Sequence, residues 1–511
     1  MLDRALQLFN SLGRELQEFV PLESGRVRMY SCGLTVYNYA HVGNLRAYLF
    51  TDTLRRALQL KGHDVVQVMN ITDVGHLTSD ADEGEDKMEL AAERRGKTVW
   101  EIAAYYTEEF RRDLVRLNVL APSVWCRATD HIQEMIEFTR VIEAHGYAYE
   151  LDDGLYFDTG KVTDYGRLGL LDVAGLQEGA RVGAKEGKRN PTDFAIWRRS
   201  PREGRRLMEW HSPWGVGAPG WHLECSVMSL KYLGSRFDIH TGGIDHRQVH
   251  HPNEMAQNEA YLGRGSRAVN YWLHNEFLTF GEDGEKMSKS TGRFLRLATL
   301  EEWGIHPLAF RHFVLMATYR RPLEFSFAAL VAAQSGLGRT LRRIAALKER
   351  AGDLGWLGLA AEHRFSRGGS FGYLTRALVE PVADAAAPWL DRLDEALARD
   401  LGTPTALAHL GELLADEALA PQAALRVAAV YDLALGLALL TTAPEELNLR
   451  PAAAAFTAEE VAALLAEREA ARAARDFARA DAIRAQLTAG GVDVQDSRSG
   501  TVWEWLPRQS F

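Results

Sequence analysis

The chain is poor in cysteine and has no long apolar run. Cysteine occurs three times in 511 residues, as Cys32, Cys126 and Cys225, which argues against a disulfide framework and leaves metal binding or simple burial as their roles. The N-terminal residues do not form a basic segment followed by an apolar one, and no uninterrupted apolar stretch is long enough to cross a membrane. We therefore expect a cytoplasmic protein without a membrane span.

An excess of positive charge is also missing. The formal net charge is −10, which does not by itself favour a polyanionic partner. Local basic runs such as residues 339–350 (RTLRRIAALKER) are compatible with phosphate contacts, although the simpler interpretation is a solvated helix face. With 46% hydrophobic and 25% charged residues, the chain can bury several cores, and its length predicts three or four domains.

The sequence does contain a strand, helix, strand pattern near its start. Residues Gly25 to Cys32 predict a short strand, and the apolar spacing from Ala47 to Leu58 predicts a helix that ends at Gly62. Residues Asp64 to Met69 are apolar and β-branched, and they predict a second strand. Such a unit is typical of parallel sheets.

The motif HVGN, residues 41–44, lies at the predicted junction between the first strand and this helix. A helix N-terminus presents free N–H groups and the positive end of the helix dipole to a phosphate. Gly43 would allow close backbone approach, and His41 could hydrogen-bond a phosphoryl oxygen. Because four residues recur by chance, the interpretation needs a second signature.

That second signature is KMSKS, residues 286–290, within the glycine-flanked run GEDGEKMSKSTGR. Lys286 and Lys289 supply ammonium groups suited to the charge that develops on a nucleoside triphosphate in its transition state. Together, HVGN and KMSKS resemble the paired signatures of class I aminoacyl-tRNA synthetases.

A candidate metal site joins distant parts of the sequence. His250 and Glu254 are four residues apart, so a helix would place both on one face, and Cys32 and Cys225 would complete a set of two sulfurs, one nitrogen and one oxygen. Zinc accepts such ligands in a roughly tetrahedral arrangement. The alternative is that these are ordinary core or surface residues, because spacing alone does not bring the two distant cysteines together.

A series of segments resembles one class I family, the cysteinyl-tRNA synthetases. In order, these are YSCGLTVYNYAHVGN, NITD, RATDHI, DFAIW, GWHLECS, FDIHTGG, HHPNE and KMSKS. The resemblance runs from about residue 20 to 325 and resumes in RDFARADAIRAQLTAGGVDVQDSRSGTVW near the C-terminus. Asn44 departs from the commoner H-x-G-H form, which has a second histidine there.

The resemblance implies site residues, position by position. The zinc ligands would be Cys32, Cys225, His250 and Glu254, with His251 beside a ligand position but not in it. The catalytic residues would be His41, Gly43, Asn44, Lys286 and Lys289, of which His41 and Lys289 bind ATP. The amino-acid pocket would include Thr72, Trp221, His240 and Asp245.

The activity implied is attachment of L-cysteine to its cognate tRNA through a cysteinyl-adenylate, with ATP and Mg²⁺ as co-substrate. One Zn²⁺ per chain would bind the substrate thiolate, an interaction that serine cannot match, so editing is unnecessary. The implied partners are cysteine-accepting tRNA, L-cysteine and ATP, and we expect a monomer.

The fold that we expect is α/β: a class I synthetase Rossmann-type parallel sheet with an insertion, followed by an α-helical bundle and a small α+β C-terminal domain. The expected domains are a catalytic nucleotide-binding domain in two halves, a connective insertion, a KMSKS-loop and stem-contact region, a tRNA-binding helical bundle and an anticodon-binding domain. Their ranges are 1–120 with 206–275, 121–205, 276–328, 329–445 and 446–511.

Several local elements complete the expectation. The acidic residues 70–88 predict a mobile loop near the active site, residues 91–116 a helix, and residues 147–158 a hairpin that turns at Asp153-Gly154. Near the C-terminus we expect helices at 459–472 and 476–487, the first capped by Thr457 and Glu460, then strands at 492–494 and 501–505. We expect Trp503 to close the small core rather than stack on a base.

Three other functions remain open from the sequence. A cysteine ligase that acts on an amino sugar would share the catalytic half but would lack the last domain. A noncatalytic tRNA-binding relative would not need to keep His41, Gly43 and both lysines of KMSKS. A zinc-dependent nucleotidyl transferase for a small molecule would leave the helical and C-terminal third unexplained.

Overall fold

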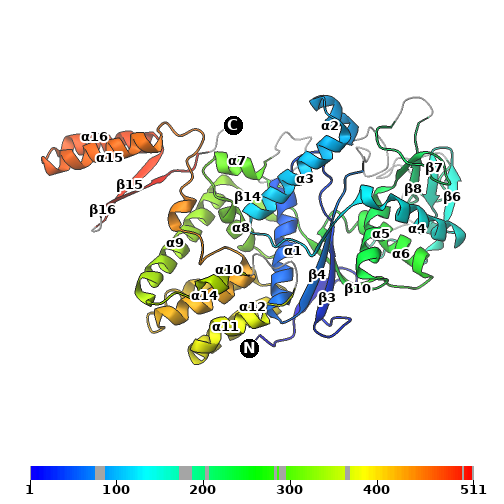
Figure 1. The fold of residues 1–511 in the computed structure, drawn as a ribbon, viewed down its shortest axis with the longest axis horizontal. Coiled ribbons are helices and arrows are strands. Elements are labelled where there is room, and N and C mark those ends of the chain that lie inside the picture. Colours follow the sequence, from blue (N-terminus) through cyan, green and yellow to red (C-terminus); the bar gives the residue numbers. More distant parts are fainter. Residues whose placement is uncertain are drawn as a thin grey trace.

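The computed structural model describes residues 2–74, 87–171, 187–201, 206–280, 285–286, 295–362, 369–497 and 500–508. Its centre is a five-stranded sheet in which every neighbouring pair is parallel, in the order β11-β10-β3-β4-β5 (Figure 1). The strands are β3 (Arg26–Ser31), β4 (Asp64–Ile71), β5 (Val124–Arg127), β10 (Phe237–Gly243) and β11 (Val269–Asn275). The expected Rossmann-type sheet is therefore confirmed.

Helices cover both faces of this sheet. Helix α1 (Val42–Leu60) packs on one face, and α4 (Ile132–Ala144), α5 (Trp221–Leu233) and α6 (His250–Leu262) lie on the other (Figure 1). The buried residues of α1 include Leu45, Leu49, Leu54 and Leu58, which recur at helical spacing. The predicted strand, helix, strand unit is present, and α1 begins inside the HVGN motif.

The single helix expected at residues 91–116 is two helices in the structure. Residues 91–116 do not form a single helix, because α2 (Lys87–Arg95) ends before Gly96, which has a φ of +61°, and α3 (Val99–Arg116) begins after it. Thr98 then caps α3: its hydroxyl accepts a hydrogen bond from the backbone of Glu101, whose carboxylate accepts one from the backbone of Thr98. A glycine in the left-handed region ends one helix, and a capping box starts the next.

The inserted region forms a four-stranded antiparallel sheet in the order β6-β7-β8-β9. Its strands are β6 (Ala148–Leu151), β7 (Gly154–Phe157), β8 (Phe194–Arg199) and β9 (Gly217–Pro219), so the expected hairpin is present. Residues of β5 belong to the parallel sheet, and β9 leads through Gly220 directly into α5. The antiparallel sheet therefore differs from the expected insertion, 121–205, at both ends. It begins at Ala148, after that range starts, and ends at Pro219, beyond the end of the range.

After the parallel sheet, the chain forms a small mixed sheet and then helices. The sheet contains β12 (Leu278–Phe280), β13 (Glu285–Lys286) and β14 (Leu323–Phe325), with α7 (Leu297–Glu302) and α8 (Pro307–Leu315) between them. The bundle that follows contains α9 (Phe327–Ala351), α10 (Leu357–Glu362), α11 (Gly372–Val379), α12 (Ala383–Ala398), α13 (Thr403–Leu413) and α14 (Pro421–Leu435). Its apolar faces form one continuous core, so the expected α-helical bundle is present.

The C-terminal unit extends from one end of the molecule (Figure 1). It consists of α15 (Ala458–Ala473), α16 (Phe477–Ala489), β15 (Val492–Ser497) and β16 (Gly500–Trp505), and the expected capping box between Thr457 and Glu460 is present. Trp505 is buried in its core, and the half-buried Trp503 packs against that core. At the other end of the chain, β1 (Gln7–Asn10) and β2 (Glu15–Glu18) form a hairpin.

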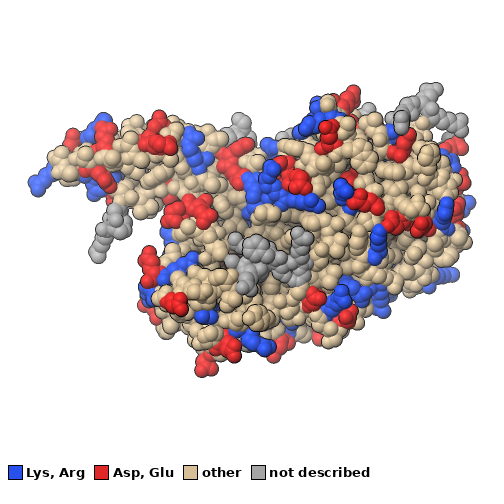
Figure 2. Space-filling model, in the orientation of Figure 1, with Lys and Arg blue, Asp and Glu red and all other residues tan. Residues whose placement is uncertain are grey.

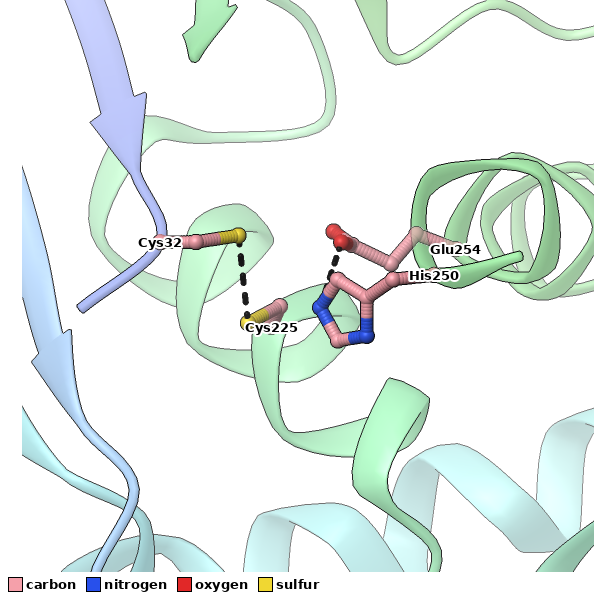
Figure 3. A group of neighbouring side chains, drawn as sticks. All are labelled: Cys32, Cys225, His250 and Glu254. Carbon is pink, nitrogen blue, oxygen red and sulfur yellow. Dashed lines mark hydrogen bonds and ion pairs between the residues drawn. The ribbon is translucent and has the colours of Figure 1, made fainter. Parts of the chain in front are cut away.

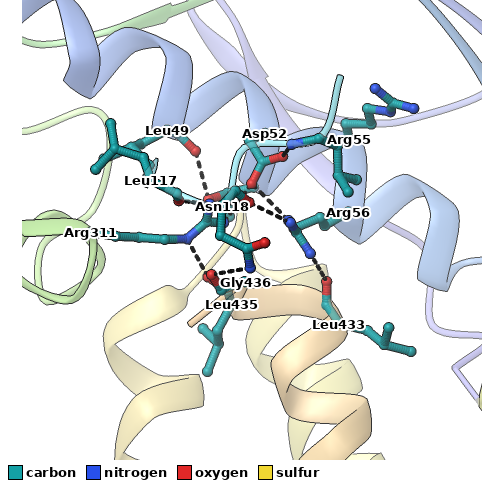
Figure 4. Close-up of polar contacts among 12 residues, drawn as sticks. Leu49, Asp52, Arg55, Arg56, Leu117, Asn118, Arg311, Leu433, Leu435 and Gly436 are labelled. Carbon is teal, nitrogen blue, oxygen red and sulfur yellow. Dashed lines mark hydrogen bonds and ion pairs between the residues drawn. The ribbon is translucent and has the colours of Figure 1, made fainter. Parts of the chain in front are cut away.

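A buried ion cluster joins α1 to α8 and the bundle (Figure 4). The Nε of Arg56 lies 2.7 Å from Oδ2 of Asp52, one turn earlier on α1, and Arg311 of α8 contacts the same carboxylate oxygen. Arg311 also donates to the carbonyl of Leu435 and Arg56 to that of Leu433, both at the C-terminal end of α14. Because these carbonyls carry the negative end of the helix dipole, they help to balance the second arginine.

Among the described helices, none is long and apolar enough to span a membrane.

Candidate active site

A cavity of about 260 Å³ opens at the carboxyl ends of the central parallel strands. Its lining comes from the segments that follow β3, β4, β10 and β11, together with the N-termini of α1 and α5. Ligands of open α/β sheets bind at this edge, where strand order reverses on either side of the first strand. Most of the sequence-predicted site residues line it: Cys32, His41, Gly43, Asn44, Thr72, Trp221, Cys225, Asp245 and His250.

The HVGN motif forms the N-terminal cap of α1. The backbone N–H of Asn44 donates to Nδ1 of His41 at 3.1 Å, and the backbone N–H of His41 donates to Oδ1 of Asn44 at 3.2 Å. Since Nδ1 accepts a hydrogen bond, the proton of the neutral ring lies on Nε2, which is then a donor. Asn44 therefore completes the cap that holds this tautomer, a role that the sequence did not reveal.

Gly43 has no room for a side chain, because a Cβ built there would lie 2.9 Å from Nδ1 of His41. Gly33 is restricted more strongly, since a Cβ there would lie 1.6 Å from the carbonyl oxygen of Asn70. The close approach lets the side chain of Asn70 bind both neighbours: its Oδ1 accepts from the Gly33 N–H at 2.8 Å, and its Nδ2 donates to Oγ1 of Thr72 at 3.0 Å. Thr72 is thereby fixed in the cavity wall.

Four side chains from three elements meet beside the cavity (Figure 3). Cys32 follows β3, Cys225 lies in α5, and His250 and Glu254 lie one turn apart in α6, as their spacing predicts. The two sulfur atoms are 3.9 Å apart, and Nε2 of His250 is 3.0 Å from Oε1 of Glu254. All four possible ligand atoms lie within 4.8 Å of one another, so this is a metal-capable cluster.

The geometry of the cluster fits a tetrahedral ion. With metal–sulfur bonds of about 2.3 Å, the edge of a tetrahedron between two sulfurs is about 3.8 Å, close to the sulfur separation. Oε1 of Glu254 is buried and lacks a well-aligned hydrogen-bond donor among the described residues, although His250 lies near it. A buried carboxylate oxygen in that state is suited to a cation.

Charge accumulates in this cluster. Burial raises the pKa of Glu254, but His240 and His250 outweigh this effect and lower the pKa to about 2. A hydrogen bond from Cys32 lowers the pKa of Cys225 to about 7. Burial lowers the pKa of His250, but Glu254 and Cys225 outweigh it and raise the pKa to about 10. His250 thus holds a proton beside the carboxylate of Glu254 and a thiol of lowered pKa, and a divalent cation can take the place of protons held by such a cluster.

Histidines that sequence reasoning did not assign surround the ligands. His222 contacts His250, with 2.9 Å between their Nδ1 atoms, and Nδ1 of His251 lies 2.8 Å from Nε2 of His274. Nε2 of His251 lies 3.5 Å from the sulfur of Cys32, so His251 could also ligate an ion in a second grouping with Cys32, His240 and Glu254. The paired histidines in HHPNE were the available signal for this network.

Two of the described residues expected at the site, His240 and Glu254, do not line the cavity. His240 is fully buried, and its Nε2 contacts Oε2 of Glu254 at 2.9 Å, so it holds a cluster residue rather than facing the cavity. Lys286 lies in β13, opposite Thr279 of β12, and Lys289 is outside the described residues. Most of the acidic stretch 70–88 is also outside them.

Comparison with known proteins gives a consistent family. Residues 18–335 match the model for the tRNA synthetases class I (C) catalytic domain, and residues 457–503 match the cysteinyl-tRNA ligase anticodon binding domain. The second match disfavours the amino-sugar ligase, which would lack that domain.

Curated relatives cover nearly the whole chain. A cysteine--tRNA ligase of Zymomonas mobilis subsp. mobilis is 50% identical over 98% of this chain and 97% of its own. A cysteine--tRNA ligase of Novosphingobium aromaticivorans is 48% identical over the same shares.

A solved methionyl-tRNA synthetase of Mycobacterium tuberculosis, in complex with methionyl-adenylate, has a TM-score of 0.50 and 19% identity over 83% of this chain and 92% of its own, which shows a shared fold. The parallel sheet with its terminal cavity, the metal-capable cluster and these matches lead to one conclusion: the chain belongs to the cysteine--tRNA ligases, class I aminoacyl-tRNA synthetases that join cysteine to tRNA.

Proposed function

We propose that the chain forms cysteinyl-adenylate at this cavity and selects cysteine with one zinc ion held by Cys32, Cys225, His250 and Glu254. The observation that carries the proposal is that three of these four residues line the same cavity as His41 and Asn44. A metal-capable cluster and a phosphate-directed helix N-terminus thereby face one substrate-sized space.

The proposed reaction has two steps, formation of the adenylate and transfer of cysteine to the tRNA. In the first, the cysteine carboxylate attacks the α-phosphorus of ATP, which is bound with Mg²⁺, and pyrophosphate leaves. The Nε2–H of His41 donates to a phosphoryl oxygen, and Lys286 and Lys289 stabilise the developing negative charge. In the second, a terminal ribose hydroxyl of the tRNA attacks the adenylate carbonyl, and AMP leaves.

Gly43 and Asn44 serve the same step through His41. Gly43 leaves room for the His41 ring, and Asn44 holds its Nδ1 as an acceptor. Thr72, Trp221 and Asp245 line the amino-acid end of the cavity, and the ring of Trp221 lies 4.3 Å from that of His250. His240 acts from behind, by holding Glu254.

Selection against serine follows from the donor set. Cysteine and serine differ by one atom, and packing discriminates such a pair poorly. When bound, zinc supplies a Lewis acid that favours a sulfur ligand and lowers the pKa of the substrate thiol. His222 and His251 hold the surrounding side chains in place.

The remaining assignments are consistent with this function. We propose the domain ranges 1–120 with 206–275, 121–205, 276–328, 329–445 and 446–511 as functional units, with β5 counted in the catalytic sheet and β9 in the insertion. The bundle and the C-terminal unit bind tRNA, and the protein acts as a monomer in the cytoplasm, where tRNA is charged.

The test is cysteine-dependent ATP–pyrophosphate exchange in protein of assayed zinc content. We expect strong exchange with cysteine and none with serine, and we expect Cys225→Ser to lose both zinc and exchange. Cys126→Ser is the matched control, because Cys126 is buried in β5 outside the metal-capable cluster. Equal exchange with serine, or full activity in zinc-free protein, would contradict the proposal.

A further inference from the structure

An aromatic and basic surface adjoins the active-site cavity. It is formed by Tyr39, Tyr105, Arg95, Lys97 and Arg296, and we call it the entrance surface. Tyr39 lines the cavity and lies two residues before His41, and its hydroxyl is 2.6 Å from that of Tyr105 on α3. Tyr39 therefore links the cavity wall to α3.

Tyr106 packs beneath the rings of Tyr39 and Tyr105 and restricts their movement. Tyr106 is 2% exposed, and its ring meets those of Tyr39 and Tyr105 edge to face, at centroid distances of 5.0 and 5.2 Å. Tyr105 itself is 37% exposed. An exposed ring on a rigid support can stack on a planar ligand at little cost in conformational entropy.

Three cations lie over these rings. The guanidinium of Arg296 is 4.6 Å from the centroid of Tyr39, that of Arg95 is 5.0 Å from Tyr106, and the ammonium of Lys97 is 5.5 Å from Tyr105. Figure 2 shows Lys and Arg side chains over α2 and α3 on this face of the molecule, with Asp and Glu side chains beside them. Cations placed beside aromatic faces are suited to a ligand that has both rings and phosphates.

The surroundings of these cations differ from those of the basic residues further along α3. Further along α3, three arginines each pair with a carboxylate one turn back: Arg111 with Glu108, Arg112 with Glu109, and Arg116 with Asp113. Within the part of the chain that the structure describes, Arg95, Lys97 and Arg296 form no ion pair with a carboxylate. Asp113 and Glu101 lie near enough for Arg296 and Lys97 to lower the pKa of each carboxyl, but neither is in contact with the cation, so a polyanion can still bind here.

We propose that the entrance surface binds the unpaired 3′-terminal nucleotides of the tRNA and guides the terminal ribose to the adenylate. Proteins bind unpaired RNA by stacking bases on aromatic side chains and by pairing phosphates with Arg and Lys. The surface offers both kinds of contact, and Tyr39 connects it to the cavity. This inference rests on the proposed function, because only the second transfer uses RNA.

The experiment compares the two transfers in Tyr105→Leu and Tyr105→Phe. We expect both variants to keep cysteine-dependent pyrophosphate exchange, which needs no tRNA. In aminoacylation we expect Tyr105→Leu to lower kcat/KM for tRNA about tenfold, the effect of losing one stacked base. Tyr105→Phe keeps the ring and should stay within about twofold of the wild type.

Tyr232→Leu is the matched control. Tyr232 is 38% exposed on α5, and its hydroxyl contacts Nε2 of His131 at 3.0 Å, so it resembles Tyr105 in exposure and in hydrogen bonding. It does not line the cavity. We expect this variant to match the wild type in both assays.

Direct binding identifies the part of the RNA involved. Removing the unpaired 3′ nucleotides from the tRNA should weaken binding to the wild type, and should weaken it less for Tyr105→Leu, which has already lost one of the contacts. An Arg95→Gln variant should show a shallower dependence of tRNA affinity on salt, because one phosphate contact is lost.

Three results would overturn the inference: loss of exchange in Tyr105→Leu, equal loss of affinity for intact and shortened tRNA, or no loss at all. Loss of exchange would show that Tyr105 supports the fold. Equal loss of affinity would show that it contacts another part of the RNA, and no loss would show that it does not contribute to binding. Absence of cysteine-dependent exchange in the wild type would instead overturn the proposed function, and this inference with it.

Discussion

Replacing Asp52 by asparagine should destabilise the protein by about 3–5 kcal/mol, the usual cost of leaving a buried charge without its partner. The carboxylate contacts Arg56 and Arg311 and accepts a hydrogen bond from the backbone of Leu120 at 2.8 Å. All three charged side chains are buried, so water cannot take over the lost contacts. An amide keeps the shape of the group but removes its charge.

The assay is unfolding in urea, followed by far-ultraviolet circular dichroism, with Asp391→Asn as control. Asp391 pairs with Arg4 at 2.7 Å, but both side chains are largely exposed, so this variant should lose at most about 1 kcal/mol. If Asp52→Asn had the same midpoint as the control, the buried cluster would contribute no more than a surface pair, and the reasoning would be refuted.

The same cluster predicts the direction of acid sensitivity. Burial raises the pKa of Asp52, but Arg56 and Arg311 outweigh this effect and lower the pKa to about 2. The unfolded-state value is about 3.9, so the folded state binds this proton less tightly than the unfolded state does. The contribution is complete above about pH 4 and is lost as the pH falls toward 2, and Asp52→Asn should lack this part of the acid transition.

Three further outcomes are expected. Gly43→Ala should lower the rate of cysteine-dependent pyrophosphate exchange at least about tenfold, because the new Cβ would displace the ring of His41; unchanged exchange would show that this ring is not needed. Glu254→Gln should reduce bound zinc, measured by metal analysis, and a variant that retains full zinc would remove Glu254 from the ligand set. Asp496→Asn breaks the paired hydrogen bonds from Arg468 in the C-terminal unit; it should lower aminoacylation but leave exchange unchanged, and a loss of exchange would mean that this unit supports the catalytic domain.

Local patterns predicted the local structure well, because short-range physics decides it. The spacing of Ala47, Leu54 and Leu58 correctly predicted α1. The four-residue separation of His250 and Glu254 correctly predicted that both lie on one face of a helix, α6. The break at Gly96 was missed, since a glycine inside an apolar pattern does not by itself show that its backbone enters the left-handed region.

The assembly of the site could not be predicted from spacing. Cys32 and Cys225 come together because α5 packs over the neighbouring strands β3 and β4, and such packing between distant segments is not encoded in local periodicity. The resemblance to a family supplied that information instead. The inward position of His240 was missed for a related reason: alternation along β10 does not say which element will cover each side chain.

The direct passage from β9 through Gly220 into α5 has a consequence for how this protein can change over evolution or in engineering. A Cβ at Gly220 would lie 2.1 Å from the carbonyl oxygen of Ala195, so the edge of the insertion is locked to the residue that precedes Trp221. The insertion is therefore not an exchangeable cassette. Any graft or deletion that alters its last strand is expected to move the first turn of the helix that places Trp221 and Cys225 in the cavity wall.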